Sequence, residues 1–219
     1  MSIASKLDAL IQSGIRRIGE LMIQADASNG NFVLSHHQDA ELVHQASHGG
    51  LELHTSAASA RAISTYSDDG TYRFAKAQCN LIRGWVMVLE TPEELLQALD
   101  IFYPAAVGLH LARRDGQLDV QHLRDKLERQ TGMYRFTRTI TDEDAQSLVQ
   151  SVCGPAHQCA KRILWQLDAD TPLDDSEASR FNGIPTAGPK NEAIPLLCRE
   201  ACNHFVAECR RLVKQRNQR

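Results

Sequence analysis

The sequence lacks any run of about 18 consecutive apolar residues, the length at which a segment is read as a membrane-spanning helix. Its first residues, MSIASKLDALIQSG, contain an acidic residue and no continuous apolar stretch, so we expect no secretory signal. The formal net charge of −3 provides no broad positive surface for nucleic acid. We therefore expect a cytoplasmic protein that binds neither membranes nor nucleic acid.

Motifs for common catalytic chemistry are also missing. No phosphate-binding loop, no GxGxxG motif and no Ser-His-Asp order can be read in the sequence, and no internal repeat is present. The 219 residues, of which 42% are hydrophobic and 23% charged, suffice for one large or two small globular domains. The chain thus has no obvious catalytic apparatus of its own.

Cysteine is the residue type that points to chemistry. The chain has six cysteines, and without an export signal they indicate a reducing compartment and not a disulfide framework. Four of them form two pairs: Cys153 and Cys159 within CGPAHQC, and Cys198 and Cys202 within CREAC. Two thiol pairs that are separated in sequence and meet in space are the usual way in which a chain encloses a metal centre.

The spacing within the pairs bears on which metal centre this is. Cys198 and Cys202 precede an apolar periodic run, so we expect both in the first turns of one helix, with Cβ atoms about 5–6 Å apart. One zinc ion holds its sulfur atoms less than about 4 Å apart, whereas a [4Fe–4S] cube spreads them by about another 2 Å. Neither pair has the Cys-x2-Cys spacing that zinc sites prefer. These observations favour a [4Fe–4S] cluster, with zinc, structural thiols or a disulfide left as alternatives.

The remaining cysteines and the nearby histidines have simpler interpretations. Cys79 and Cys209 fall outside the pairs, and we expect both to be buried thiols, with Cys209 packed behind the site. His157 and His204 lie inside or beside the pairs and could replace a thiolate or donate to a cluster sulfur. We favour the interpretation that both histidines are simply exposed near a polar turn.

A second group of possible ligands lies near the N-terminus. His36 and His37 are followed by Asp39, and such an HHxD cluster could bind a metal ion. No further carboxylate or imidazole recurs at helical spacing, so a polar strand end is the favoured interpretation.

A basic segment with aromatic neighbours is a candidate ligand site. It contains Tyr72, Arg73, Lys76, Arg83 and Trp85. Guanidinium and ammonium groups beside aromatic rings would suit a planar ligand that carries carboxylates. A solvated basic loop beside a core tryptophan is the alternative, which we favour.

Periodicity predicts an α+β fold in two domains. We expect an α+β stabilising or docking domain over 1–137, with a small sheet and helices. A mostly helical metal-binding domain follows over 138–219, with a long loop over 168–193. Helices are predicted over 2–13, 55–66, 92–102, 105–113, 119–130, 142–152, 160–168 and from 197 onward, and strands over 17–24, 32–35, 86–90 and 134–140.

Several segments carry a family resemblance. DDGTYRFAKAQCNLIRGW, ALDIFYPAA, RQTGMYR and the C-x5-C…C-x3-C ending resemble the accessory region of certain sirohydrochlorin cobaltochelatases, over residues 15–213. In that family a stabilising domain and a [4Fe–4S] cluster-binding domain follow the chelatase domains. The resemblance implies that Cys153, Cys159, Cys198 and Cys202 bind a cluster.

The sequence departs from that family because it has no chelatase half. It therefore lacks the histidine pair that those enzymes use to insert the metal into the macrocycle. The resemblance therefore implies a non-catalytic accessory or electron-transfer module. Its partners would be a separate chelatase or redox protein, and its ligand a tetrapyrrole. A cluster-dependent enzyme that acts on a tetrapyrrole and a zinc-stabilised interaction domain are the alternatives.

Overall fold

The computed structural model describes residues 1–45, 49–64, 81–118, 139–153, 159, 161–164, 192–199 and 201–218. They divide into two compact units. The first contains the described residues up to 117 together with 192–196, and the second contains those of 118–164 and 197–218. The predicted domain boundary at 137/138, the predicted helix over 119–130 and most of the predicted loop lie outside the described residues.

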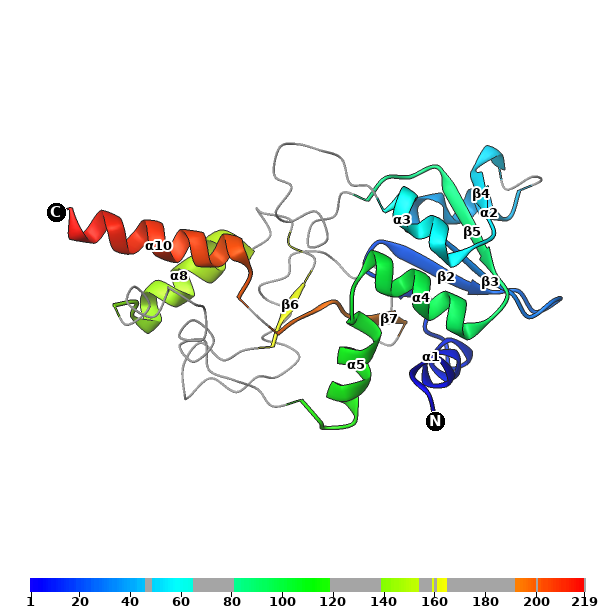
Figure 1. Cartoon of the computed structure of the whole chain (residues 1–219), viewed down its shortest axis with the longest axis horizontal. Helices are drawn as coiled ribbons and strands as arrows, with labels where there is room; N and C mark the ends of the chain where they lie inside the picture. The colour runs from blue at the N-terminus through cyan, green and yellow to red at the C-terminus, as the bar shows by residue number, and fades with distance from the viewer. Residues whose placement is uncertain are drawn as a thin grey trace. The chain divides into compact units, whose positions relative to one another are not determined.

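A mixed sheet forms the centre of the first unit (Figure 1). Its six described strands are β1 (Arg17–Ile18), β2 (Leu21–Ala25), β3 (Phe32–His36), β4 (Glu52–His54), β5 (Trp85–Leu89) and β7 (Ala193–Ile194). They follow the order β4-β5-β3-β2-β1-β7. The outer pairs, β4 with β5 and β1 with β7, are parallel, and the inner pairs are antiparallel. The predicted hairpin between the second and third strands is confirmed.

One face of the sheet supplies the core of the first unit. Leu34 lies between Ile23 and Met87 on neighbouring strands, and Phe32 is paired with Leu89, all of them buried. Alternation along each strand places every second side chain on this face. The helices of this unit are α1 (Ile3–Gln12), α2 (Ala40–Val43), α3 (Ala60–Ile63), α4 (Pro92–Phe102) and α5 (Ala106–Arg114), with 3₁₀ turns η1 (His37–Asp39) and η3 (Ala57–Ser59). Helix α1 packs against α4 and β2, and α4 packs against β5.

Local capping signals account for the start of α4. The Thr91 hydroxyl accepts the N–H of Glu94 at 3.2 Å, Pro92 is the first helical residue, and two glutamates occupy the first turn, as predicted. Helices α4 and α5 meet at an angle of 105°. In the described part of the chain no single helix is long and apolar enough to span a membrane. The bent pair of α4 and α5 meets the length and composition criteria only when the two helices are taken together.

A tight turn divides the predicted strand over 17–24 into β1 and β2. Gly19 has φ +55°, a left-handed conformation that favours glycine. Tyr103 packs directly against it, and its hydroxyl accepts the backbone N–H of Glu20 at 3.1 Å. A Cβ at position 19 would lie 2.6 Å from Cζ of that ring. The prediction of one continuous strand is wrong because this ring contact requires a glycine turn.

Replacing Gly19 with alanine is expected to lower the free energy of unfolding by about 2–4 kcal/mol, since backbone strain adds to overpacking against the buried Tyr103 ring. Gly30→Ala is the matched control: Gly30 also has a positive φ, +77°, but a Cβ there meets nothing within 4 Å. Urea unfolding followed by circular dichroism measures both. Equal losses in the two variants would show that the tyrosine contact contributes nothing.

Two helices and a small sheet form the second unit. Helix α8 (Asp142–Cys153) packs against α10 (Asn203–Asn217), and β6 (Arg162–Ile163) pairs in parallel with β8 (Leu197–Cys198). The core comprises Ile140, Ala145, Leu148, Val149, Val152, Cys153, Ile163, Ala201, Phe205, Val206, Cys209 and Val213. The helix predicted over 142–152 is confirmed. The helix predicted over 160–168 is wrong at 162–163, where the chain forms β6 by pairing with a distant strand.

Candidate metal centre

The four paired cysteines lie on different elements of the second unit. Cys153 is the last residue of α8 and is 8% exposed. Cys159 precedes β6, Cys198 belongs to β8, and Cys202 is the exposed N-cap residue of α10. The prediction that Cys198 and Cys202 share the first turns of one helix is wrong, because Cys198 is held in a strand by pairing with β6.

Antiparallel packing of α8 and α10 brings Cys153 and Cys202 to the same end of the helix pair. Near the opposite end of the helix pair, Arg216 Nη1 donates to Asp144 Oδ2 at 2.6 Å. Arg216 Nη2 also donates to Asp144 Oδ1. Asp144 lies near the start of α8 and Arg216 near the end of α10. Figure 1 shows the two helices side by side. The end of α8 and the start of α10 must therefore lie together.

The small sheet adds the other two cysteines. Ile163 of β6 is the partner of Cys198 in the parallel register, and the N–H of Leu164 donates to the Cys198 carbonyl at 2.9 Å. Cys159 lies four residues before Ile163 in the chain. Pairing of β6 with β8 thus joins the first cysteine pair to the second.

Burial and the neighbouring thiols both act on the pKa values of the cysteines. Burial, followed by the fields of Cys159, Cys198, Cys202 and Cys209, raises the pKa of Cys153. Burial also raises the pKa of Cys159, with Cys202 contributing and the backbone N–H of Lys161 opposing the shift. Raised pKa values keep thiols protonated, so a metal bound at these sulfur atoms must displace protons.

The donor set fits a polynuclear iron–sulfur cluster. Four thiols from α8, the segment before β6, β8 and the N-cap of α10 would suffice to give each iron of a cube one ligand. Over the described ranges, the group of three ligand atoms within 4.8 Å of one another is Glu20, His36 and His37, not three of these sulfur atoms. One tetrahedral zinc ion would hold them less than about 4 Å apart, so the wider spacing suits a cube better.

Backbone N–H groups support two of the sulfur atoms. The N–H of Phe205 donates to Cys202 Sγ at 3.5 Å, so the cysteine caps α10. The N–H of Lys161 donates to the Cys159 thiol. N–H groups at a helix start favour negative charge. They would therefore stabilise the thiolates of an anionic cluster.

The structure tests only some of the predictions for the other cysteines and histidines near this site. Cys209 is 0% exposed in the core, as predicted, and burial raises its pKa to about 12. His204 is half-buried in the first turn of α10, and its role stays a prediction. Cys79 and His157 lie outside the described residues.

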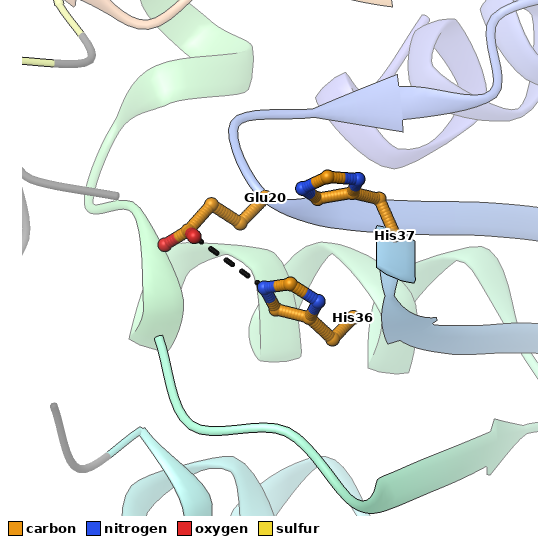
Figure 2. Close-up of side chains that lie close together, drawn as sticks. All are labelled: Glu20, His36 and His37. Carbon is orange, nitrogen blue, oxygen red and sulfur yellow. Dashed lines mark hydrogen bonds and ion pairs between the residues drawn. The ribbon is translucent and has the colours of Figure 1, made fainter. Parts of the chain in front are cut away.

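A buried polar cluster in the first unit joins Glu20, which was not predicted, to the histidine pair that the sequence offered as possible ligands. Glu20, 5% exposed, lies in the turn between β1 and β2, and His36, 2% exposed, ends β3. His36 Nε2 lies 3.4 Å from Glu20 Oε1, and the Leu81 N–H donates to Glu20 Oε2 at 2.8 Å. Figure 2 shows both histidine rings beside the carboxylate. Burial, with Arg17 and His36 adding to it, lowers the pKa of His37 to about 4.

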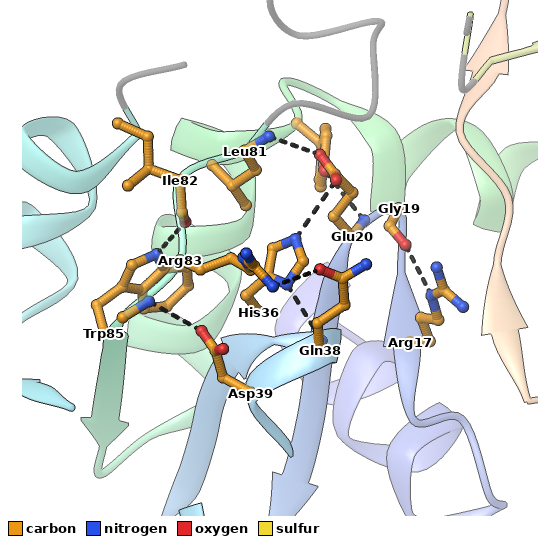
Figure 3. Close-up of polar contacts among 12 residues, drawn as sticks. Arg17, Gly19, Glu20, His36, Gln38, Asp39, Leu81, Ile82, Arg83 and Trp85 are labelled. Carbon is orange, nitrogen blue, oxygen red and sulfur yellow. Dashed lines mark hydrogen bonds and ion pairs between the residues drawn. The ribbon is translucent and has the colours of Figure 1, made fainter. Parts of the chain in front are cut away.

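The same region positions the segment before β5. Asp39 Oδ2 accepts the N–H of Gly84 at 2.9 Å, and Arg83 Nη1 donates to Gln38 Oε1 at 3.0 Å (Figure 3). The HHxD sequence therefore includes a strand end and its polar anchors, as the favoured interpretation predicted. Nothing local in the sequence marked Glu20, whose burial depends on β2–β3 pairing.

Two of the five predicted ligand-binding residues are described. Arg83 is exposed. Trp85 is 2% exposed, stacks on Phe102 with ring centroids 5.2 Å apart, and donates its Nε1–H to the Ile82 carbonyl at 2.8 Å. The tryptophan ring thus packs in the core. Tyr72, Arg73 and Lys76 lie outside the described residues, and the ligand role of the group stays a prediction.

Comparison with known families agrees with the two units. Residues 115–211 match the 4Fe-4S iron-sulfur cluster binding domain, a match that includes all four paired cysteines, so the chain is an iron–sulfur protein. Residues 3–114, just over half of the 219 residues, match the DR2241 stabilising domain. The chain belongs to the DR2241 stabilising domain family, and its cofactor is a [4Fe–4S] cluster.

A solved structure has the same fold. DR2241 from Deinococcus radiodurans is described as a multi-domain protein with structural similarity to chelatases and with two additional novel domains. It matches 97% of this chain with a TM-score of 0.71 and 24% sequence identity, and the chain spans 41% of that protein's length. No curated protein sequence matches the chain. The resemblance and the α+β fold expected from the sequence are confirmed.

Proposed function

We propose that this chain is an accessory electron-transfer module for metal insertion into a tetrapyrrole, with Cys153, Cys159, Cys198 and Cys202 as the cluster ligands. The proposal is supported by α8–α10 packing and by β6–β8 pairing, which join the elements that carry the two cysteine pairs. A bound [4Fe–4S] cluster supplies one-electron transfer. The protein contributes sulfur ligands, N–H donors and a buried core on one side.

The association with metal insertion rests on the relatives. The similar multi-domain protein has structural similarity to chelatases, and the sequence resembles the accessory region of sirohydrochlorin cobaltochelatases. The partner would be a chelatase domain or a redox protein. Paired thiols such as these persist in a reducing compartment, so we place the protein in the cytoplasm.

Anaerobic purification followed by metal analysis tests the cluster assignment. We expect equal amounts of iron and sulfide, at the stoichiometry of a cube, a broad visible absorption, and an electron paramagnetic resonance signal after reduction with dithionite. One zinc ion per chain without sulfide would contradict the proposal.

Binding of sirohydrochlorin tests the tetrapyrrole association. The cluster-loaded protein is titrated with the macrocycle, in parallel with an Arg73→Ala/Arg83→Ala double variant. Charge-assisted hydrogen bonds contribute about 1.5–3 kcal/mol each when a bound ligand shields them from water, and much less on an open surface. If the macrocycle covers these arginines, the double variant should bind at least about tenfold more weakly. Equal binding by both proteins would remove these arginines from the proposal.

A further inference from the structure

The polar cluster of Glu20, His36 and His37 is built by strand pairing. His36 is the register partner of Leu21, so the end of β3 lies beside the turn that carries Glu20. The N–H of His37 donates to the Glu20 carbonyl at 2.8 Å, which fixes the following residue next to the same turn. Alternation along β3 turns His36 to the core face, the face of Leu34. The three side chains are thus gathered by the backbone itself.

The geometry of the cluster is that of potential metal ligands. One ligand atom from each residue lies within 4.8 Å of the other two. The rings of His36 and His37 stack with centroids 4.7 Å apart and an interplanar angle of 27° (Figure 2). Glu20 and His36 are buried, and His37 is half-buried, so His37 is the most accessible of the three side chains.

The distance between His36 Nε2 and Glu20 Oε1 suits a pair of metal ligands better than a strong hydrogen bond. His36 Nε2 and Glu20 Oε1 are 3.4 Å apart, which is long for a charge-assisted hydrogen bond of about 2.7–2.9 Å. Two ligands at about 2.0–2.1 Å from a tetrahedral ion are separated by about 3.4 Å. The pair therefore already has the separation that an ion between them requires.

We propose that Glu20, His36 and His37 form a binding site for one divalent first-row transition metal ion, separate from the cysteines. Two imidazoles and one carboxylate suit zinc, iron(II) or cobalt(II), and do not suit magnesium or calcium, which prefer oxygen ligands alone. The Leu81 N–H holds Glu20 Oε2, which leaves Oε1 for the ion.

Binding requires local rearrangement. The stacked rings of His36 and His37 must turn so that their nitrogen lone pairs, which lie in the ring planes, meet at one point. The N–H of Gln38 donates to His36 Nδ1 at 3.1 Å, so the neutral ring carries its proton on Nε2. A metal ion at Nε2 moves this proton to Nδ1 and displaces the Gln38 contact. No net proton is released at His36, and two hydrogen bonds of this ring, one from the Gln38 N–H and one to Glu20 Oε1, are exchanged for the metal–ligand bonds.

Metal binding to the cluster-loaded protein tests the site. Anaerobic equilibrium dialysis against Zn²⁺, and the visible absorption difference on adding Co²⁺, should show one added ion per chain with the iron content unchanged. His37→Gln should weaken binding at least about tenfold. His44→Gln, an exposed histidine one helix away, is the matched control and should bind like the wild type.

A stability measurement covers variants that fold poorly. Zn²⁺ should raise the melting temperature of the wild type and of His44→Gln, and not that of His37→Gln or Glu20→Gln. Absence of an added ion, or equal binding by the wild type and His37→Gln, overturns the metal site. Neither result affects the cysteine site, because the iron and sulfide counts report on that site separately.

Discussion

Replacing Cys153 with alanine is expected to abolish cluster binding and to loosen α8 and α10, while the sheet of the first unit stays folded. Cys153 is the most buried of the four paired cysteines and ends α8 where that helix meets the start of α10. A cluster that binds only the folded form adds its binding free energy to folding. Iron and sulfide content should fall to background, and hydrogen exchange should speed up in both helices.

Cys209→Ala is the matched control for that experiment. Cys209 is a buried thiol on the facing helix and belongs to the same core, so both variants lose a sulfur atom from similar packing. The control should keep its cluster and lose only about 1–2 kcal/mol from the cavity. Loss of the cluster in both variants would show that packing, and not ligation, determines cluster retention.

The Trp85→Ala variant is expected to lower the free energy of unfolding of the first unit by about 3–5 kcal/mol, the usual loss for a buried large aromatic. The indole stacks on Phe102 and donates its N–H to Ile82, so the substitution leaves a cavity and an unpaired carbonyl. Urea unfolding followed by circular dichroism measures the loss. A ring that served only as the wall of a ligand site would leave stability unchanged.

Arg83→Gln provides the comparison within the same segment. Arg83 is exposed and donates to one side chain, Gln38. Its replacement should change the free energy of unfolding by no more than about 0.5 kcal/mol. A large loss in this variant would show that the segment before β5 is held by the arginine and not by the tryptophan.

Elements with local signals could be predicted from the sequence. Thr91, Pro92 and the following glutamates define the start of α4 because capping depends on residues within one turn. The helix ending at Cys153 follows from its apolar spacing, together with a capping box in which Thr141 and Asp144 exchange hydrogen bonds. The four cysteines could be named as candidates because thiol pairs are rare.

Elements that depend on distant partners could not be predicted. Strand β8 has two residues and forms only because Leu197 and Cys198 meet Arg162 and Ile163. Cysteine is also not a usual N-cap residue, so nothing in the sequence placed Cys202 before α10 instead of inside it. Glu20 and His36 are sixteen positions apart, and the register of one hairpin joins them.

The position of β7 has a consequence for the order in which the protein is made. Strand β7 pairs with β1 through Arg17 with Ala193 and Ile18 with Ile194, so the sheet gains this edge strand only after residue 194 has been synthesised. By then the ribosome has already released Cys153 and Cys159, whose partners Cys198 and Cys202 are still to come. Because domains complete as units during synthesis, the first thiol pair waits in an unfinished chain. A cluster that needs all four thiols can therefore be completed only after Cys202 has been synthesised.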